Sequence, residues 1–426
     1  MLHKISGMQE FLADAQRQVN EQLDSAIRTL TELVAIPSVS WDSFDPAEGI
    51  RCAQAVKEYA VKLDFFESVE ILTAPIPNSG TQGRPAVVAR RAARNGAPTV
   101  LLYAHSDVQP PGDRLVWDTD PFVATRIGDR IFGRGAADDK AGIVSHVESI
   151  RALLKLQPNT DLGIVLFVEG EEEAGSPSFE SFLGRYKEQL AADVIIVADS
   201  TNFTADIPAL TVSLRGNVTF NLTVRTLDHA LHSGMFGGAV PDAFLPFNRL
   251  IGSCYAEDGS CSIPGIQGID TITPEYTEEQ ARAESGLLES VKLIGGGSIL
   301  NRLWHHPTLT VTGMDIPPVA EASNTLLPSV RARLSLRIPP NVDVSDAAQT
   351  IIQFLHDHVP FGAEISVDDV NVGQGYLVSH DVVSGKVREA MTLAWNADVV
   401  DIGVGGSIPF ISSFADEFPE ASVLVT

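Results

Sequence analysis

Short, uncharged apolar runs that end in an acidic or imidazole side chain constrain the fold of this chain more than any other feature. Residues 99–104 (TVLLYA), 162–168 (LGIVLFV) and 194–198 (VIIVA) are such runs. Their length and β-branched content predict strands that are buried on both faces, as in a parallel sheet covered by helices. The first run leads directly into His105 and Asp107. Because open α/β sheets bind their ligands at the carboxyl ends of the strands, these two residues are candidates for a functional site.

The segments around these runs predict alternating helices and strands. Apolar residues at helical spacing indicate one helix over residues 10–36, a second over 48–63 and a third that begins at 138–140. Two further strands are expected near residues 69–74 and 87–90. Short apolar strands that alternate with helices are typical of a three-layer α/β domain with a mostly parallel sheet, and this is the fold class that we predict.

The pattern changes near residue 210, where polar and apolar residues begin to alternate as in a sheet with one solvated face. The expected order is strand, helix, strand, strand, helix, strand, over residues 210–225, 240–254, 308–312, 330–338, 344–359 and 363–370. This order is that of a ferredoxin-like α+β domain. The α/β pattern then returns, with a helix near 382–395 and strands near 399 and 423. We therefore expect a first domain over residues 1–209, an inserted domain over 210–374, and a second part of the first domain over 375–426.

The charge and cysteine content exclude several classes of partner. The formal net charge is −25 over 426 residues, and both nucleic acids and anionic membranes require basic surfaces. No apolar run approaches the length of a membrane span, and residues 1–16 lack the apolar core of a signal peptide. The three cysteines form neither a metal motif nor a disulfide framework. We therefore expect a cytoplasmic protein that binds neither nucleic acid nor membrane.

Acidic and imidazole groups stand at four expected strand ends or strand-to-helix turns. They are His105 and Asp107, Asp138 and Asp139, the acidic run of residues 169–173, and Asp199. Each group alone has an ordinary structural interpretation, since an aspartate often caps a helix and an acidic run often begins one. If these strands share one sheet, however, the four groups converge on one edge. A single histidine among several carboxylates suits a zinc or manganese pair, with a free glutamate to take a proton from a bridging water.

Five ordered motifs give the chain a specific resemblance to a known family. They are HSD at residues 105–107, GRGAADDKAG at 133–142, EGEEEAGS at 169–176, LHSGMFGG at 231–238 and GGSIP at 405–409. In this order and at these spacings they resemble the di-metal peptidase family of aminoacylase, carboxypeptidase G, succinyl-diaminopimelate desuccinylase and carnosinase, and most closely the carnosinase-like dipeptidases. The resemblance extends from the first helix to the last residue. It implies that the first domain is catalytic and that the inserted domain is a lid and dimerisation domain.

The resemblance implies two divalent metal ions per subunit, with zinc as the expected metal and manganese or cobalt as alternatives. His105 would bind the first metal, and Asp107 would orient that histidine. Asp138 would bridge the two metals, and its peptide bond to Asp139 would be cis. The remaining assignments are Glu172 as general base, Glu173 as a ligand of the second metal and Asp199 as a ligand of the first.

The later motifs imply the substrate contacts. His232 matches a histidine that, in the family, reaches across a dimer to the other active site and stabilises the tetrahedral oxyanion, a role that suits a donor aimed at developing charge. Asn324 and Arg337 resemble groups that hold the substrate, and a guanidinium can bind a carboxylate through two parallel hydrogen bonds. Gly406 and Ser407 offer backbone donors for a substrate carboxylate.

The chain departs from the family pattern near its end. The family uses a late histidine as a ligand of the second metal, whereas the last histidine here is His380 and the sequence ends in the strand-like run ASVLVT. The second metal would keep only Asp138, Glu173 and the bridging water. We therefore expect that the chain is truncated at its C-terminus and that its second metal site is incomplete.

Together these residues predict metal-dependent hydrolysis of the amide bond of a dipeptide, with a metal-bridging water as nucleophile and Glu172 as general base. Asp199, rather than a glutamate at that position, favours a dipeptidase over a carboxypeptidase. The expected substrates are dipeptides or short N-acyl amino acids, and the shared role of His232 implies a homodimer. Two alternatives stay open here: an N-acyl-amino-acid deacylase or carboxypeptidase on the same scaffold, and a non-catalytic binding relative.

Overall fold

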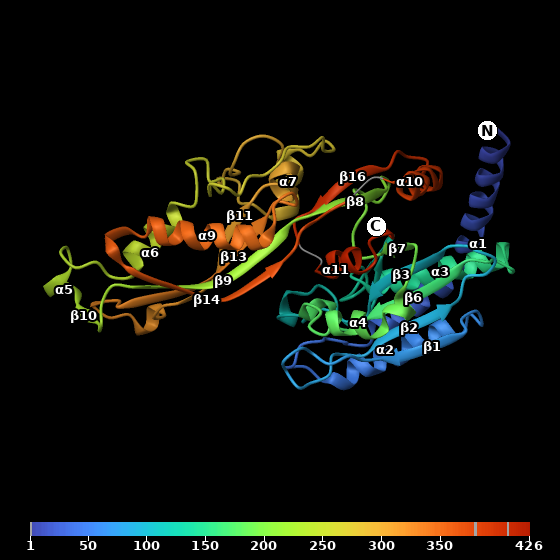
Figure 1. The fold of residues 1–426 in the computed structure, drawn as a ribbon, viewed down its shortest axis with the longest axis horizontal. Helices are drawn as coiled ribbons and strands as arrows, with labels where there is room; N and C mark the ends of the chain where they lie inside the picture. Colours follow the sequence, from blue (N-terminus) through green and yellow to red (C-terminus); the bar gives the residue numbers. More distant parts are fainter. Residues whose placement is uncertain (1, 379–380, 407–408) are drawn as a thin grey trace. The chain divides into compact units, whose positions relative to one another are not determined.

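The computed structural model describes residues 2–378, 381–406 and 409–426, and its helices and strands form two compact units (Figure 1). The first unit comprises Met1–Thr211, Ser379–Val400 and Ser413–Thr426. The second comprises Val212–Val378 and Asp401–Ser412. Residues 401–412 therefore belong to the second unit, whereas the sequence pattern placed everything after residue 375 in the first domain.

The first unit is built on a mixed sheet with the strand order β1-β2-β6-β3-β7-β17. The strands are β1 (Ser68–Leu72), β2 (Ala86–Arg91), β3 (Thr99–His105), β6 (Gly163–Glu169), β7 (Val194–Val197) and β17 (Ser422–Val425). β6, β3, β7 and β17 run parallel, and β2 and β1 continue the sheet antiparallel. Every residue of β6 is buried, as expected for a central strand covered on both faces. The prediction of a mostly parallel α/β sheet is confirmed.

Helices cover both faces of this sheet, as a three-layer domain requires. They are α1 (Leu2–Val34), α2 (Pro46–Val61), α3 (Lys140–Leu156), α4 (Phe179–Leu190), α10 (Val382–Trp395) and, from Ser413 onward, α11 (Pro409–Glu417). On one face, Val56 of α2 and Ile143 of α3 share a buried core with Leu166 of β6. The next residue of β6 points to the opposite face, where the ring of Phe167 stacks on that of Phe182 in α4 with centroids 5.3 Å apart. Short elements complete the unit: η1 (Arg114–Val116), β4 (Thr125–Ile127), β5 (Arg130–Phe132) and η2 (Glu172–Ala174).

The second unit has the predicted ferredoxin-like arrangement. Its antiparallel sheet has the order β11-β13-β9-β14. The strands and the two main helices are β9 (Gly216–Arg225), α6 (Phe244–Gly252), β11 (Thr308–Asp315), β13 (Ser329–Ile338), α9 (Val344–His358) and β14 (Glu364–Gly373). Phe247 of α6 and Ile351 of α9 are buried with Phe220 and Leu334 of the sheet in one core, so both helices cover the same face.

Two expected strands differ from the structure. Residues 210–225, expected as one strand, form β8 (Ala209–Leu214) and β9 in different sheets, with a break at Arg215. β8 lies between β15 (Tyr376–Leu377) and β16 (Val400–Val404) in a separate three-stranded sheet. The strand expected near residue 399 is β16, and it therefore does not join the large sheet of the first unit.

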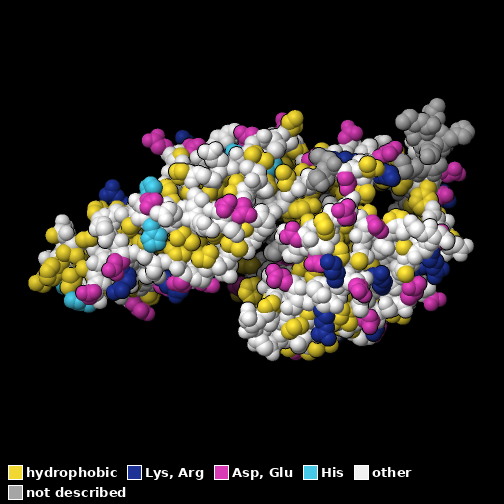
Figure 2. Space-filling view, in the orientation of Figure 1, with side chains coloured by type: hydrophobic (Ala, Val, Ile, Leu, Met, Phe, Trp, Pro, Cys, Tyr) yellow, Lys and Arg dark blue, Asp and Glu magenta, His cyan; other side chains and the backbone are white. Residues whose placement is uncertain are grey.

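The remaining elements of the second unit are short. They are β10 (Leu231–His232), α5 (Ser233–Phe236), α7 (Glu278–Ser285), α8 (Ile299–Trp304), η3 (Val319–Glu321), β12 (Thr325–Leu326) and η4 (Pro360–Gly362). Exposed hydrophobic side chains gather where β10 and α5 lie (Figure 2), and Met235 and Phe236 of α5 are 76% and 41% exposed. Among the described residues, no helix has the length and hydrophobicity needed to span a membrane.

Candidate functional site

The candidate site of the first unit lies at the carboxyl ends of three neighbouring parallel strands. His105 is the last residue of β3, which pairs with β6 on one side and β7 on the other. Glu172 follows the end of β6, and Asp199 follows the end of β7. Because the three strands are parallel and adjacent, the residues after them meet at one edge of the sheet.

His105 is fully buried and has carboxylates on both sides of its ring. Nδ1 lies 3.1 Å from the backbone carbonyl of Asp107, while Nε2 lies 3.0 Å from Oδ1 of Asp138 and 3.6 Å from Oδ1 of Asp199. A carbonyl oxygen can only accept a hydrogen bond, so Nδ1 carries a proton, and Nε2, which faces the carboxylates of Asp138 and Asp199, is the atom that would bind a metal in place of these contacts. Burial alone would lower the pKa of His105, but its hydrogen-bonding carboxylate partners raise it well above the usual value.

Asp107 also holds the loop that follows β6. Its Oδ1 accepts the backbone N–H of Glu172 at 3.1 Å, and its Oδ2 accepts that of Glu173 at 3.0 Å. The same Oδ1 lies 3.4 Å from Nδ1 of His105. One buried carboxylate thus contacts the histidine of one strand end and both glutamates of the next.

Three side chains of this edge converge closely enough to surround a metal ion, either as ligands or as a base beside it. One ligand atom from each of His105, Glu172 and Asp199 lies within 4.8 Å of the others. Burial raises the pKa of the Glu172 carboxyl to about 8, and the charges of nearby carboxylates add to this rise while His105 opposes it. Partly buried carboxylates around one buried imidazole are the donor set of a divalent cation bound by nitrogen and oxygen, so these residues fit such an ion.

Two further predicted ligands lie close by in different settings. Asp138 accepts from Nε2 of His105 with a side chain that is 67% exposed, and this hydrogen bond lowers the pKa of its carboxyl. Glu173 instead bonds Gln109, whose backbone N–H lies 3.1 Å and whose Nε2 lies 2.6 Å from its two carboxylate oxygens. Burial raises the pKa of Glu173. No motif or pattern in the sequence indicated the contact between Glu173 and Gln109.

The turn that presents Asp138 is held by its neighbour. The Asp138–Asp139 peptide bond is cis, as the resemblance implied. Asp139 is the N-cap of α3: its Oδ1 accepts the N–H of Gly142 and its Oδ2 accepts the N–H of His105, both at 3.1 Å. A Cβ at Gly142 would lie 2.2 Å from Oδ1 of Asp139, so this close approach requires glycine. The capping interpretation of Asp139 is therefore correct, and the same carboxylate fixes the end of β3.

Two buried charged side chains around the site support the backbone. Oε1 of Glu171 accepts the N–H of Ser178 at 2.7 Å, and its Oε2 accepts the N–H of Arg84 at 2.7 Å. Lys140 is fully buried, and its Nζ donates to the carbonyls of Leu33 and Ile36 at the end of α1. Nothing in the sequence distinguishes Glu171 or Lys140 from the other acidic and basic residues around them.

The other predicted residues belong to the second unit. β10 pairs with β12, which places His232 opposite Thr325, and the N–H of Ser233 donates to the carbonyl of Asn324 at 2.9 Å. His232 is exposed, and its Nδ1 accepts the N–H of Gly234 at 3.1 Å. The structure thus brings His232 and Asn324 together.

Arg337 and Gly406 also lie in the second unit. Arg337 is half-buried in β13, and Gly406 follows β16. Burial lowers the pKa of the Arg337 guanidinium. Ser407, the remaining predicted residue, lies outside the described residues.

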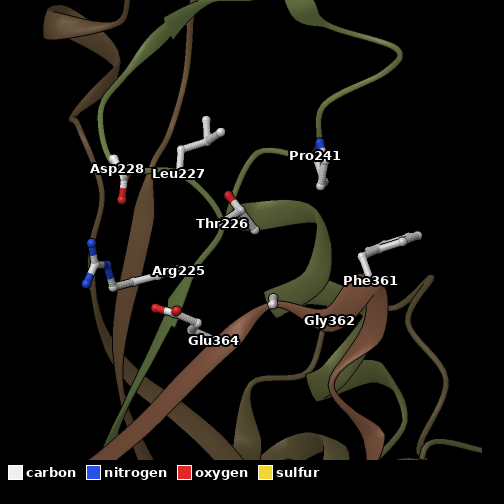
Figure 3. A pocket seen from close by; sticks show the side chains of 9 residues that line it. Arg225, Thr226, Leu227, Asp228, Pro241, Phe361, Gly362 and Glu364 are labelled. Atoms are coloured by element: carbon white, nitrogen blue, oxygen red, sulfur yellow. The ribbon is translucent and has the colours of Figure 1, made fainter.

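Two cavities differ in their relation to these residues. In the first unit, a pocket of about 620 Å³ has Trp41, Ile76 and Glu173 in its wall. In the second unit, a pocket of about 350 Å³ is lined by charged side chains, including Arg225 and Glu364, with the ring of Phe361 on its other side (Figure 3). The described residues that line this second pocket include none of the predicted site residues, whereas Glu173, a predicted ligand, lines the first.

Comparisons with known proteins agree with the motifs. Residues 101–420 match the sequence profile of peptidase family M20/M25/M40. Cysteinylglycine-S-conjugate dipeptidase of Corynebacterium striatum is 33% identical over 339 residues, which cover 76% of this chain and 72% of that protein. Beta-Ala-His dipeptidase of Homo sapiens is 28% identical over 354 residues, which cover 78% and 69%. The structure of the di-peptidase Dug1p from Saccharomyces cerevisiae matches with a TM-score of 0.79 at 22% identity, over 97% of this chain and 91% of that one, and so shares its fold.

Proposed function

The chain belongs to peptidase family M20/M25/M40, as its motifs predicted, and we propose that it is a metal-dependent dipeptidase. The observation that carries this proposal is the grouping of His105, Glu172 and Asp199 at the carboxyl edge of the sheet. Two of the relatives are named for the cleavage of dipeptides, and one of them is more than 30% identical to this chain.

The proposed cofactor is a pair of divalent metal ions, with zinc as the first choice. His105 and Asp199 would hold one ion, Glu173 the other, and Asp138 would contribute to both. When bound, such ions polarise the amide carbonyl and lower the pKa of a coordinated water. The buried position of His105 and the donation from its Nδ1 to the Asp107 carbonyl support the role of Nε2 as a ligand.

Glu172 is the proposed general base. Its carboxylate lies within 4.8 Å of ligand atoms of His105 and Asp199, and burial raises its pKa to about 8, so the group can both take up and release a proton near neutral pH. Its carboxylate would accept the proton of the attacking water and then donate that proton to the amine that leaves when the C–N bond breaks. The backbone of Glu172, held by Asp107, keeps the carboxylate at the strand end while this transfer occurs.

The second unit supplies the proposed substrate contacts. His232 would donate to the oxyanion, and its Nδ1 is already engaged with the Gly234 N–H, which leaves Nε2 for that task. Asn324, Arg337 and the Gly406–Ser407 backbone would bind the substrate, with Arg337 on its carboxylate.

A homodimer and a cytoplasmic location complete the proposal. Met235 and Phe236, next to His232, expose hydrophobic side chains of the kind that a second subunit would cover. Cys52, Cys254 and Cys261 are all free thiols, which suits a reducing compartment.

The test is hydrolysis of a panel of dipeptides and N-acetyl amino acids with added Zn²⁺ or Mn²⁺. We expect dipeptide cleavage that Glu172→Gln lowers roughly 10²- to 10⁴-fold while the bound metal stays unchanged. The matched control is Glu180→Gln, at an exposed glutamate in the first turn of α4. Preference for the acetylated substrates would instead identify a deacylase. Bound metal without turnover of any substrate would refute an enzymatic function.

A further inference from the structure

Arg215 is a buried charged residue that none of the motifs includes. It is 8% exposed and stands between β8 and β9, at the point where the chain passes from one sheet to the other. The polar and apolar alternation continues unchanged through this position, so the sequence predicted a single strand there. An arginine at a strand break, with its guanidinium turned inward, requires hydrogen-bond partners that offset the free-energy cost of burying the charge.

The partners of Arg215 come from two other segments of the second unit. Its backbone N–H donates to the Val404 carbonyl at 3.3 Å, and its Nε donates to the Gly405 carbonyl at 3.2 Å. Its Nη1 donates to the carbonyl of His306 at 3.0 Å and to Oγ1 of Thr308 at 3.3 Å. Arg215 therefore joins the segment before Gly406 to residues 306–308, at the start of β11, through four hydrogen bonds.

The glycine at position 405 is explained by this contact. A Cβ on Gly405 would lie 2.8 Å from Nη2 of Arg215 and 3.1 Å from the backbone carbonyl of Leu303. Any larger residue would push the guanidinium away from the loop or the loop away from β11. The Gly405 backbone thus lies directly against the charged group.

A second guanidinium occupies the same neighbourhood. Thr308, which accepts from Arg215, is paired directly with Arg337 across the β11–β13 ladder. Burial, together with the positive charge of Arg337, lowers the pKa of Arg215 to about 10. Within the described residues, the Arg337 guanidinium makes no hydrogen bond or ion pair. The guanidinium of Arg215 donates to uncharged acceptors. Two positive charges that no carboxylate partner among the described residues neutralises favour the binding of an anion beside them.

We propose that Arg215 is a positioning residue for the substrate carboxylate, because it holds the backbone of Gly405 and adds a second positive charge beside Arg337. This inference rests on the proposed dipeptidase function. Arg337 and the Gly406 backbone would touch the carboxylate, whereas Arg215 would act through the loop and through its charge. A free C-terminal carboxylate is then a requirement that Arg215 helps to impose.

The test compares the best dipeptide of the panel with its C-terminal amide, for wild type and Arg215→Lys. Lysine keeps the charge but cannot reach the Gly405 carbonyl, the His306 carbonyl and Thr308 with one planar fork. We expect KM for the free dipeptide to rise about tenfold or more and kcat to change less than about threefold, because the loop before Gly406 loses its hydrogen bond to a charged donor. KM for the amide should stay unchanged, so the preference for the carboxylate falls by about the same factor.

The control is Arg302→Lys, since Arg302 also donates to backbone carbonyls of a glycine-containing loop, those of Ile294 and Gly295, away from Gly406 in the sequence. It should leave the preference for the carboxylate unchanged. Thr308→Val removes only one acceptor of Arg215 and should lower the preference about two- to fivefold, which keeps the test decisive if Arg215→Lys does not fold.

The outcomes separate the two claims. Wild type that cleaves no dipeptide refutes the proposed function and this inference with it. Wild type that cleaves dipeptides, with Arg215→Lys and Thr308→Val retaining the full preference for the carboxylate, overturns the inference alone. A lower Tm of Arg215→Lys with unchanged preference has the same meaning, because it shows a purely structural arginine.

Discussion

Replacing Asp107 by asparagine tests how the two strand ends are joined. The carboxylate accepts two backbone N–H groups, those of Glu172 and Glu173, at 3.1 and 3.0 Å, and it is 1% exposed. Asparagine has nearly the same shape but offers one oxygen and one NH₂ group. In Asp107→Asn, one of the two buried backbone N–H groups therefore faces the NH₂ group of asparagine, which is itself a donor. The other backbone N–H still meets an oxygen acceptor, but this oxygen carries no charge.

The expected loss of stability follows from these contacts. A buried N–H left without an acceptor costs about 1–3 kcal/mol, and the surviving hydrogen bond loses its charge-assisted part of about 1 kcal/mol. We therefore expect the free energy of unfolding of the first unit to fall by about 2–4 kcal/mol. For a unit of this size the corresponding fall in Tm is roughly 4–16 °C.

Calorimetry of the protein in EDTA measures this effect without any contribution from bound metal. Hydrogen exchange of a peptide that contains residues 172 and 173 reports on the two amides themselves. The matched control is Asp113→Asn. The Asp113 carboxylate is exposed and accepts a single backbone N–H, that of Leu115, at 2.9 Å. A melting temperature of Asp107→Asn within 1 °C of wild type, with protected amides, would refute the reasoning.

Three further predictions concern other buried groups. Burial lowers the pKa of His146 to about 4. Below pH 6.5 the histidine therefore binds a proton in the unfolded chain but stays neutral in the folded chain. As the pH falls toward 4, this difference lowers the free energy of unfolding by up to about 3 kcal/mol. Urea unfolding of His146→Gln should lack this loss, whereas exposed His356→Gln should retain it, and parallel pH profiles for all three proteins would contradict the assignment. Glu171→Gln should lower the free energy of unfolding by about 2–4 kcal/mol, because its carboxylate accepts two backbone N–H groups; an unchanged thermal melt would argue against this role. His105→Ala should lose zinc in equilibrium dialysis, and retention of the metal at wild-type affinity would remove His105 from the ligands.

Much of the fold was readable from local patterns. The apolar runs at 99–104, 162–168 and 194–198 predicted β3, β6 and β7 within about one residue at each end. β6 is buried on both faces along its whole length and β3 along most of its length, and only an uncharged run can occupy such a position without unpaired charges. Because their chain order implies parallel neighbours, the convergence of His105, Glu172 and Asp199 could also be predicted.

The contacts of the acidic groups could not be predicted in the same way. Glu171, Glu172 and Glu173 are identical side chains in one run, yet the first anchors Arg84 and Ser178, the second faces His105, and the third bonds Gln109. A charge pattern carries no information on which oxygen meets which donor. That choice depends on segments more than 60 residues away in the chain, such as Asp107 and Gln109.

The sequence by itself therefore determined the kinds of elements, their order and the chemical character of the site, because burial and hydrogen bonding along a strand or helix impose local periodicity. The tertiary structure decided where the chain leaves one sheet for another and what each buried charge contacts. Arg215 illustrates the difference: the alternation of residues 210–225 continues through it, but its partners Gly405 and Thr308 lie in distant segments. Only folding brings those partners to the guanidinium, and only their hydrogen bonds make its burial stable.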